Sequence, residues 1–215
     1  MGKATVEIAK ELNIIMKELY KKVKDVEFLI MGIGDLAYDK APIQASQFES
    51  DIRIAEQLDK IYFEGGGGPN RYESYTAAWY FGLQHTDLDC WKRGKKGIII
   101  TIGDEPLNPY LPAEKLISVI GNVKQSSDKC FETKYLYEAA YDKFDIYHLA
   151  VDDNETCYYY NKDIIEGTFG EYLDSEHLLT VKLNNLSATI VKIITAAFEN
   201  SKIADTINNK DGISW

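Results

Sequence analysis

A strongly apolar stretch lies at residues 97–103, which read Gly-Ile-Ile-Ile-Thr-Ile-Gly. Only Thr101 interrupts its isoleucines, so the segment has no polar face, and this pattern is typical of a strand covered on both faces of a parallel sheet. The pattern therefore predicts a central strand that ends at Gly103. Asp104 and Glu105 follow at its carboxyl end, where open α/β sheets bind their ligands. An acidic pair at a strand end is also common in a simple turn, so both interpretations stay open.

Apolar residues recur at spacings of three and four near both ends of the sequence, as they do in amphipathic helices. They predict helices over residues 4–24 and 186–197. Mostly apolar runs predict two further strands at residues 26–34 and 144–151, which end at Asp35 and Asp152. Weaker patterns predict an edge strand near residues 43–48, a small glycine-containing unit at 163–174, and helices at 51–63, 75–83, 113–122 and 130–143.

Strands that alternate with helices favour a mostly parallel sheet with helices on both faces. The sequence shows no internal repeat and no linker that would divide it. We therefore expect one α/β domain over residues 1–215.

Composition narrows the classes of function. The 215 residues are 45% hydrophobic and 27% charged, which is ordinary for a globular domain. The net charge of −10 opposes a phosphate backbone, so nucleic-acid binding is not expected. Because the sequence has no long apolar run and no apolar leader, we expect no membrane association and a cytoplasmic location. Three widely spaced cysteines without a Cys-x-x-Cys unit argue against a zinc site or a disulfide framework.

Four consecutive glycines at residues 65–68 are followed by Pro69 and Asn70. Such a loop can place backbone N–H groups around an anion. It matches neither the P-loop nor the dinucleotide fingerprint, so it is a weak phosphate signal. Glu73 and Ser74 stand just before a predicted helix, for which Ser74 is a candidate cap.

The order of these motifs resembles that of the von Willebrand factor A (vWA) domain, in particular its bacterial intracellular branch. The motifs are a strand ending in Gly-Ile-Gly-Asp, a glycine-rich loop before a helix, a strand ending in Gly-Asp-Glu-Pro, and a strand ending in Asp-Asp. The resemblance covers most of the chain and implies a Rossmann-like sheet. The matching stretches are residues 28–35, 65–81, 97–106, 144–152 and 167–173.

The resemblance also implies a metal site, because vWA domains hold an ion, usually Mg²⁺, between three loops at the carboxyl edge of the sheet. Asp104 matches the ligand of the third loop. In the second loop Ser74 is the candidate ligand, with Glu73 or Asn70 as substitutes. Asp35, at the end of another strand, is a further candidate.

The first metal-binding loop of the family, Asp-x-Ser/Thr-x-Ser, has no counterpart in the sequence. Met1-Gly2-Lys3 looks like the tail of that motif, and we expect Met1 to be an internal methionine of it. The family's first strand and first ligands would then be absent, and Mg²⁺, which requires near-octahedral oxygen coordination, is expected to bind weakly or not at all. The missing strand would leave two sheet edges unpaired, through which the chain can form oligomers.

Three functions stay open. The resemblance favours a protein-interaction domain that is not an enzyme, with a protein partner such as an AAA-type ATPase system. The alternative is a Mg²⁺-dependent Rossmann-like hydrolase or phosphotransferase using the strand-end carboxylates Asp35, Asp104 and Asp152. Against this alternative, the strand ends carry no Asp-x-Asp pair, and the sequence has no nucleophile beside a histidine and no phosphate-binding lysine. The three histidines are expected to be packed or solvated. The third is a structural domain without a ligand.

Overall fold

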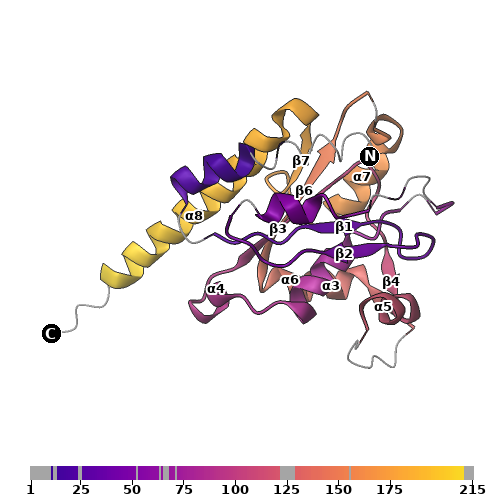
Figure 1. Cartoon of the computed structure of the whole chain (residues 1–215), viewed down its shortest axis with the longest axis horizontal. Helices are drawn as coiled ribbons and strands as arrows, with labels where there is room; N and C mark the ends of the chain where they lie inside the picture. Colours follow the sequence, from indigo (N-terminus) through magenta and orange to yellow (C-terminus); the bar gives the residue numbers. More distant parts are fainter. Residues whose placement is uncertain are drawn as a thin grey trace.

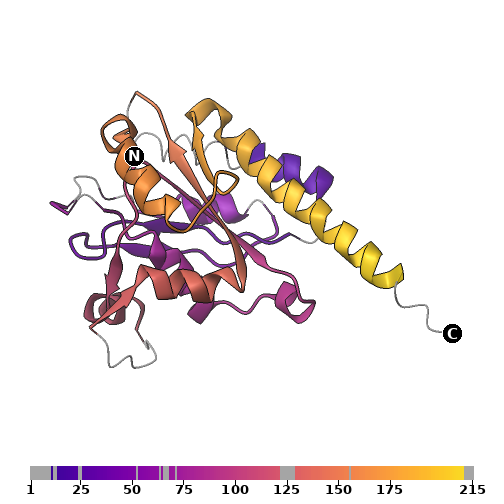
Figure 2. The same cartoon turned by 180° about the vertical axis from the view of Figure 1, so that it is seen from behind.

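Three parallel strands form the main sheet of this α/β fold, in the order β3-β6-β7. In the computed structural model, helices flank this sheet on both faces (Figures 1 and 2). Its strands are β3 (Gly97–Gly103), β6 (Phe144–Val151) and β7 (Leu178–Val181). The structure describes residues 11, 14–23, 26–51, 53–62, 64, 68–70, 72–121, 129–154 and 156–210, the last ten by their backbone only.

The register of β3 and β6 aligns the two strands over their whole length. Gly97 lies opposite Phe144, and Gly103 lies opposite Ala150. The strands predicted at residues 97–103 and 144–151 are therefore confirmed. The central place given to the isoleucine strand is wrong, because β6 lies between β3 and β7. An apolar pattern reports that both faces of a strand are covered, but it does not report which neighbours pair with its edges.

The remaining named strands form two separate antiparallel pairs. One pairs β1 (Met31–Ile33) with β2 (Ile43–Ala45), and the other pairs β4 (Tyr110–Pro112) with β5 (Cys130–Glu132). The strand predicted at 26–34 is thus much shorter, whereas the one near residue 43 is confirmed. The expectation of a single mostly parallel sheet is corrected to one parallel sheet and two small antiparallel ones.

Helices fill most of the remaining described chain, and their bounds differ from the predictions at both ends. The predicted helix at 130–143 begins later because β5 occupies its first residues, and most of the glycine-containing unit predicted at 163–174 lies in the helix α7, which ends at Gly170. The helices are α2 (Arg53–Leu58), α3 (Thr76–His85), α4 (Asp89–Lys92), α5 (Ala113–Ile120), α6 (Thr133–Tyr141), α7 (Tyr158–Gly170) and α8 (Leu186–Lys210), with a 3₁₀ turn η1 (Leu183–Asn185).

An N-terminal helix includes residues 14–22, which agrees with the predicted amphipathic pattern, while residues 4–10 and Met1-Gly2-Lys3 lie outside the described residues. In the part of the chain that the structure describes, no helix combines the length and the apolar content needed to cross a membrane.

The first core cluster packs helices α3, α6 and α7 against one face of the sheet. Trp79 of α3 and Phe169 of α7 are completely buried in it, and Ile99 reaches it from β3. His148 of β6 is also fully buried here, and its ring stacks on Phe169 with the centroids 3.7 Å apart. Burial lowers the pKa of His148 to about 3, so the ring is neutral and serves packing, as the sequence predicted.

The second core cluster covers the opposite face of the sheet. Leu149 and Val151 of β6 contact it, since side chains alternate between the two faces of a strand. The N-terminal helix adds Ile15 and Leu19, and α8 adds Ile190 together with its neighbours. Both views show the N-terminal helix, in indigo, lying beside the yellow α8 (Figures 1 and 2). Helices from the two ends of the chain therefore cover this face together.

We expect Leu149→Ala to lower the free energy of unfolding by about 2–5 kcal/mol, because it removes buried methyl groups and leaves a cavity. Leu149 is fully buried in β6, against the N-terminal helix and α8. Urea denaturation followed by circular dichroism measures the change. The control is Ile164→Ala, since Ile164 is 42% exposed on α7 and its loss should change stability by less than about 1 kcal/mol. Equal losses in the two variants would contradict the packing described here.

Candidate functional site

Acidic side chains from three loops meet near the carboxyl end of β3. We name this group the acidic edge, and its members are Asp35, Asp39, Glu73, Asp104 and Glu105. The loops are joined by hydrogen bonds. Ser74 Oγ accepts a hydrogen bond from the Leu36 N–H at 2.9 Å, and the Glu73 N–H donates to the Pro106 carbonyl oxygen at 3.4 Å. The chain thus brings together residues that are far apart in the sequence.

Asp104 is held at the base of the acidic edge by the start of α7. It is 2% exposed, and its Oδ2 accepts a hydrogen bond from the Cys157 N–H at 2.8 Å. Asn161, one turn further along α7, donates through Nδ2 to Glu105 Oε2 at 2.9 Å. An amide at a helix N-terminus is a favourable donor to a carboxylate because the helix dipole adds to the hydrogen bond. Cys157 and Asn161 carry no signal of this role in the sequence, because their polar, tyrosine-rich surroundings show no helix pattern.

Asp35 is buried, with one oxygen bonded and one without a partner. It is 3% exposed, and its Oδ1 accepts a hydrogen bond from the Ala37 N–H at 2.8 Å. Its Oδ2 is buried and has no hydrogen-bond partner in the part of the chain that the structure describes. A Cβ atom added to Gly68 would lie 2.7 Å from this Oδ2, so only a glycine lets the backbone pass this carboxylate without displacing atoms. Asp39 Oδ2 accepts a hydrogen bond from the Asp35 N–H at 2.8 Å, and this bond closes the turn between the two residues.

Glu73 is the most perturbed acid of the group. Burial is the main cause, and it raises the pKa of Glu73 to about 8 together with the nearby charges of Asp39, Asp35, Glu105 and Asp104. Its Oε2 is buried without a hydrogen-bond partner within the described portion of the chain. The side chain of Glu73 therefore carries a proton at neutral pH.

The described lysines and arginines bring no ion pair to four of these acids, which are Asp35, Asp39, Glu73 and Glu105. Burial, followed by the charge of Asp104, raises the pKa of Glu105 against smaller opposing contributions. The acidic edge is thus a partly buried group of like charges, and the pKa is raised for three of its members, Asp39, Glu73 and Glu105.

The predicted site residues are placed as follows. Asp35, Glu73, Ser74 and Asp104 lie together, although Ser74 is not the helix cap that the sequence suggested. Tyr75 precedes the first turn of α3 without a side-chain capping bond, and Ser74 Oγ binds the Leu36 N–H instead. Asn70 makes no hydrogen bond to the acidic edge within the described residues, and its Oδ1 is buried and unpartnered.

The carboxylate and hydroxyl oxygens of this group are of the kind that Mg²⁺ prefers, but their arrangement does not fit its shell. Mg²⁺ needs near-octahedral oxygens at about 2.0–2.1 Å. In the described segments, no three His, Cys, Asp or Glu side chains lie close enough together to hold one metal ion. One oxygen of Asp104 is already bonded to the Cys157 N–H. The roles of Asp104, Ser74, Asp35, Glu73 and Asn70 as metal ligands stay predictions.

Asp152, the third strand-end carboxylate, is occupied elsewhere. It follows β6, and its Oδ2 forms an ion pair with Lys182 Nζ at 3.0 Å. Its charge is not among those that raise the pKa of Glu73. The three carboxylates that the hydrolase alternative requires are therefore not one cluster in this arrangement.

Exposed tyrosines belong to the helix that contacts the acidic edge and to one of the loops that form it. Tyr159 and Tyr160 are each 83% exposed, and they lie in the first turn of α7, between the two residues that contact Asp104 and Glu105. Their rings are T-shaped to each other, with centroids 5.5 Å apart. On the other side, Tyr38 is 55% exposed, and its ring packs near Gly68, beside Asp35.

Comparisons of this chain with protein-family models, curated proteins and solved structures found no match.

We expect Glu73→Gln to change how stability depends on pH. The folded protein holds the Glu73 proton up to about pH 8, whereas the unfolded chain releases it near the ordinary value of 4.5. The stability that Glu73 contributes is therefore complete below pH 4.5 and is lost as the pH rises through 8. Because Gln does not ionise, the variant should gain stability over the natural protein by roughly 1–3 kcal/mol between pH 5 and pH 9.

Urea denaturation of both proteins across that pH range measures the difference. Glu166→Gln is the matched control, since the Glu166 side chain on α7 is 51% exposed and should give a difference that does not change with pH. A flat difference for Glu73→Gln would show that Glu73 ionises normally in the folded protein.

Proposed function

We propose that this chain is a vWA-like protein-interaction domain whose acidic edge binds a basic side chain of a protein partner. The observation that carries the proposal is the pair of buried oxygens, Asp35 Oδ2 and Glu73 Oε2, which have no hydrogen-bond partner among the described residues and lie within a group of like charges. A buried carboxylate without a compensating charge is costly, and it either takes up a proton or acquires a cation. A cationic ligand would replace the proton on Glu73.

An arginine or lysine suits this geometry better than a metal ion does. A guanidinium group forms two parallel hydrogen bonds with one carboxylate and does not need six converging oxygens. The acidic edge offers carboxylates from separate loops but no three that meet around one ion within the described residues. A basic side chain of the partner would therefore need only hydrogen bonds to the carboxylates of Asp35, Glu73 and Glu105.

The exposed tyrosines support a macromolecular partner. Tyr159 and Tyr160 offer exposed aromatic faces in the first turn of α7, the helix that contacts Asp104 and Glu105, and cations bind such faces at a gain of about 0.5–2 kcal/mol. Tyrosine and arginine are also the residues that dominate the energy of protein interfaces. A basic segment of a partner would place one side chain among the carboxylates and others on the tyrosines.

The vWA resemblance supplies the cellular context of the proposal, in which the partner belongs to an AAA-type ATPase system. In this proposal the family's ion is replaced by the partner's cation, and Mg²⁺ acts at most as a weak competitor for the same oxygens. Catalysis is not required of any residue of the edge.

The first test is calorimetric titration with an acetylated, amidated tetra-arginine peptide. We expect binding that weakens by about tenfold or more in the double variant Glu73→Gln/Glu105→Gln, because charge-assisted hydrogen bonds are lost. The control is the double variant Glu138→Gln/Glu171→Gln, which makes the same two replacements at exposed positions on α6 and after α7 and lowers the net negative charge by at least as much. An equal loss in both double variants would mean that only net charge attracts the peptide, and the proposal would be wrong.

Two further arms separate the alternatives. Titration with MgCl₂ tests whether the acidic edge binds Mg²⁺. If Mg²⁺ binds tightly, and a peptide carboxylate binds only when Mg²⁺ is present, the proposal is wrong and the domain binds its partner through a metal ion. Turnover of p-nitrophenyl phosphate that needs Mg²⁺ and is abolished by Asp104→Asn would favour the hydrolase instead. Neither result is expected if a basic side chain is the natural ligand.

A further inference from the structure

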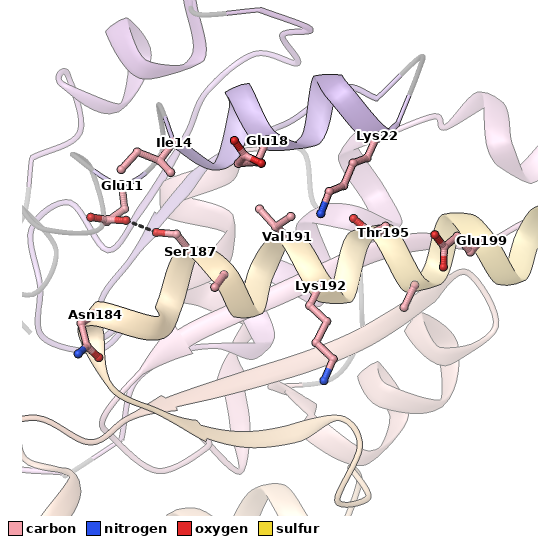
Figure 3. Close-up of a pocket in the computed structure, with 12 residues that line it drawn as sticks. Glu11, Ile14, Glu18, Lys22, Asn184, Ser187, Val191, Lys192, Thr195 and Glu199 are labelled. Carbon is pink, nitrogen blue, oxygen red and sulfur yellow. Dashed lines mark hydrogen bonds between the residues drawn. The ribbon is translucent and has the colours of Figure 1, made fainter.

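A groove of about 690 Å³ runs along the outer side of the molecule, between the N-terminal helix and α8 (Figure 3). Its apolar lining comes from Ile14 on the N-terminal helix and from Ala188, Val191 and Ala196 on α8. Ile14 is 50% exposed, although the neighbouring apolar residues of its helix are buried. The groove is long and open, so it fits a helix rather than a small molecule.

Small residues of α8 allow a helix to approach closely along this groove. Ala188, Lys192 and Ala196 are exposed and follow one another at intervals of four, so they form one stripe on the helix. Two positions of this stripe carry only a methyl group. Helix axes can approach to the shorter end of the usual range of about 8–10 Å where such small side chains meet.

Charged residues line both sides of the groove, with Glu11, Glu18 and Lys22 on the N-terminal helix and Lys192 and Glu199 on α8, and the two on α8 give it a direction. Lys192 and Glu199 both line it, both are exposed, and neither forms an ion pair within the described residues. They are separated by close to two helical turns and therefore lie on the same side of α8. If a second α8 runs antiparallel and the two helices cross near Thr195 and Ala196, Lys192 of each copy faces Glu199 of the other. The charges of Lys192 and Glu199 on one α8 are thus complementary to those on a second, antiparallel α8.

We propose that the groove is occupied by α8 of a second copy of this chain, in a two-fold antiparallel dimer. A two-fold axis uses the same surface on both copies, which a self-complementary pattern requires. The C-terminal part of α8 extends beyond the sheet and its flanking helices (Figure 1). In the proposed register this part of one copy runs along the first turns of the other α8.

The proposed dimer differs from the oligomer expected from unpaired sheet edges. It uses only helices, and its core is a layer in which the two α8 helices lie between the two N-terminal helices. Each copy contributes one apolar groove and one helix to fill the other groove. The acidic edge takes no part in the contact, so the dimer and the proposed function can be tested independently.

Sedimentation velocity over a wide range of protein concentrations tests the dimer. We expect the natural protein to form dimers, Lys192→Glu and Glu199→Lys to be monomeric over the same range, and the double variant Lys192→Glu/Glu199→Lys to recover the dimer. Recovery by the double variant also shows that the single variants fold. The matched control is the pair Lys162→Glu and Glu166→Lys, an exposed ion pair on α7, which should leave the dimer intact.

Oxidative cross-linking gives a second readout. Ala196→Cys places thiols next to the proposed axis and should give a disulfide-linked dimer, in excess of any product of the exposed Cys157 in the natural protein. Glu171→Cys should give no such excess. The proposal is overturned if the natural protein is monomeric at every concentration, or if the single charge reversals leave the dimer unchanged.

Discussion

The pairing of β3 with β6 over their whole lengths is the constraint on which the rest of the structure depends. It brings the carboxyl ends of two strands to one edge of the sheet, and Asp104 emerges directly from one of them. The same pairing fixes which side chains face each side, so that His148 and Leu149 enter different core clusters. The site and the helical layers are therefore set by one register.

The acids at the carboxyl edge of the sheet raise the free energy of the folded protein, because like charges lie close together and are partly removed from water. Helix α7 offsets part of this increase, through the Cys157 N–H and the Asn161 amide, while Asp35 and Glu73 each keep an oxygen that has no hydrogen-bond partner among the described residues. A fold selected for stability alone gains nothing from such oxygens, since apolar groups of the same size would pack at lower cost. The arrangement is typical of sites whose charge is balanced only when a ligand is bound.

Elements with strong periodic patterns were predicted well from the sequence, because burial of a whole face is visible along the chain. The strand at residues 144–151 is found with its predicted bounds, and α8 continues the predicted C-terminal pattern. Several short elements, such as β7, were missed, since four residues show no period. The side chain of Ser74 was also misjudged: its bond to the Leu36 N–H joins distant loops, and local capping rules contain no information on tertiary contacts. Convergence of the acids was anticipated, but the contribution of α7 was not.

The second core cluster joins the two ends of the described chain. Glu11 accepts a hydrogen bond from Ser187, a contact that spans 176 positions in the sequence. The apolar face of the N-terminal helix has no α8 to cover it until the residues of α8 have been synthesised. Contacts of such long range form late and slow folding. The helical layer on this face of the sheet is therefore completed only after the strands that it covers have been made.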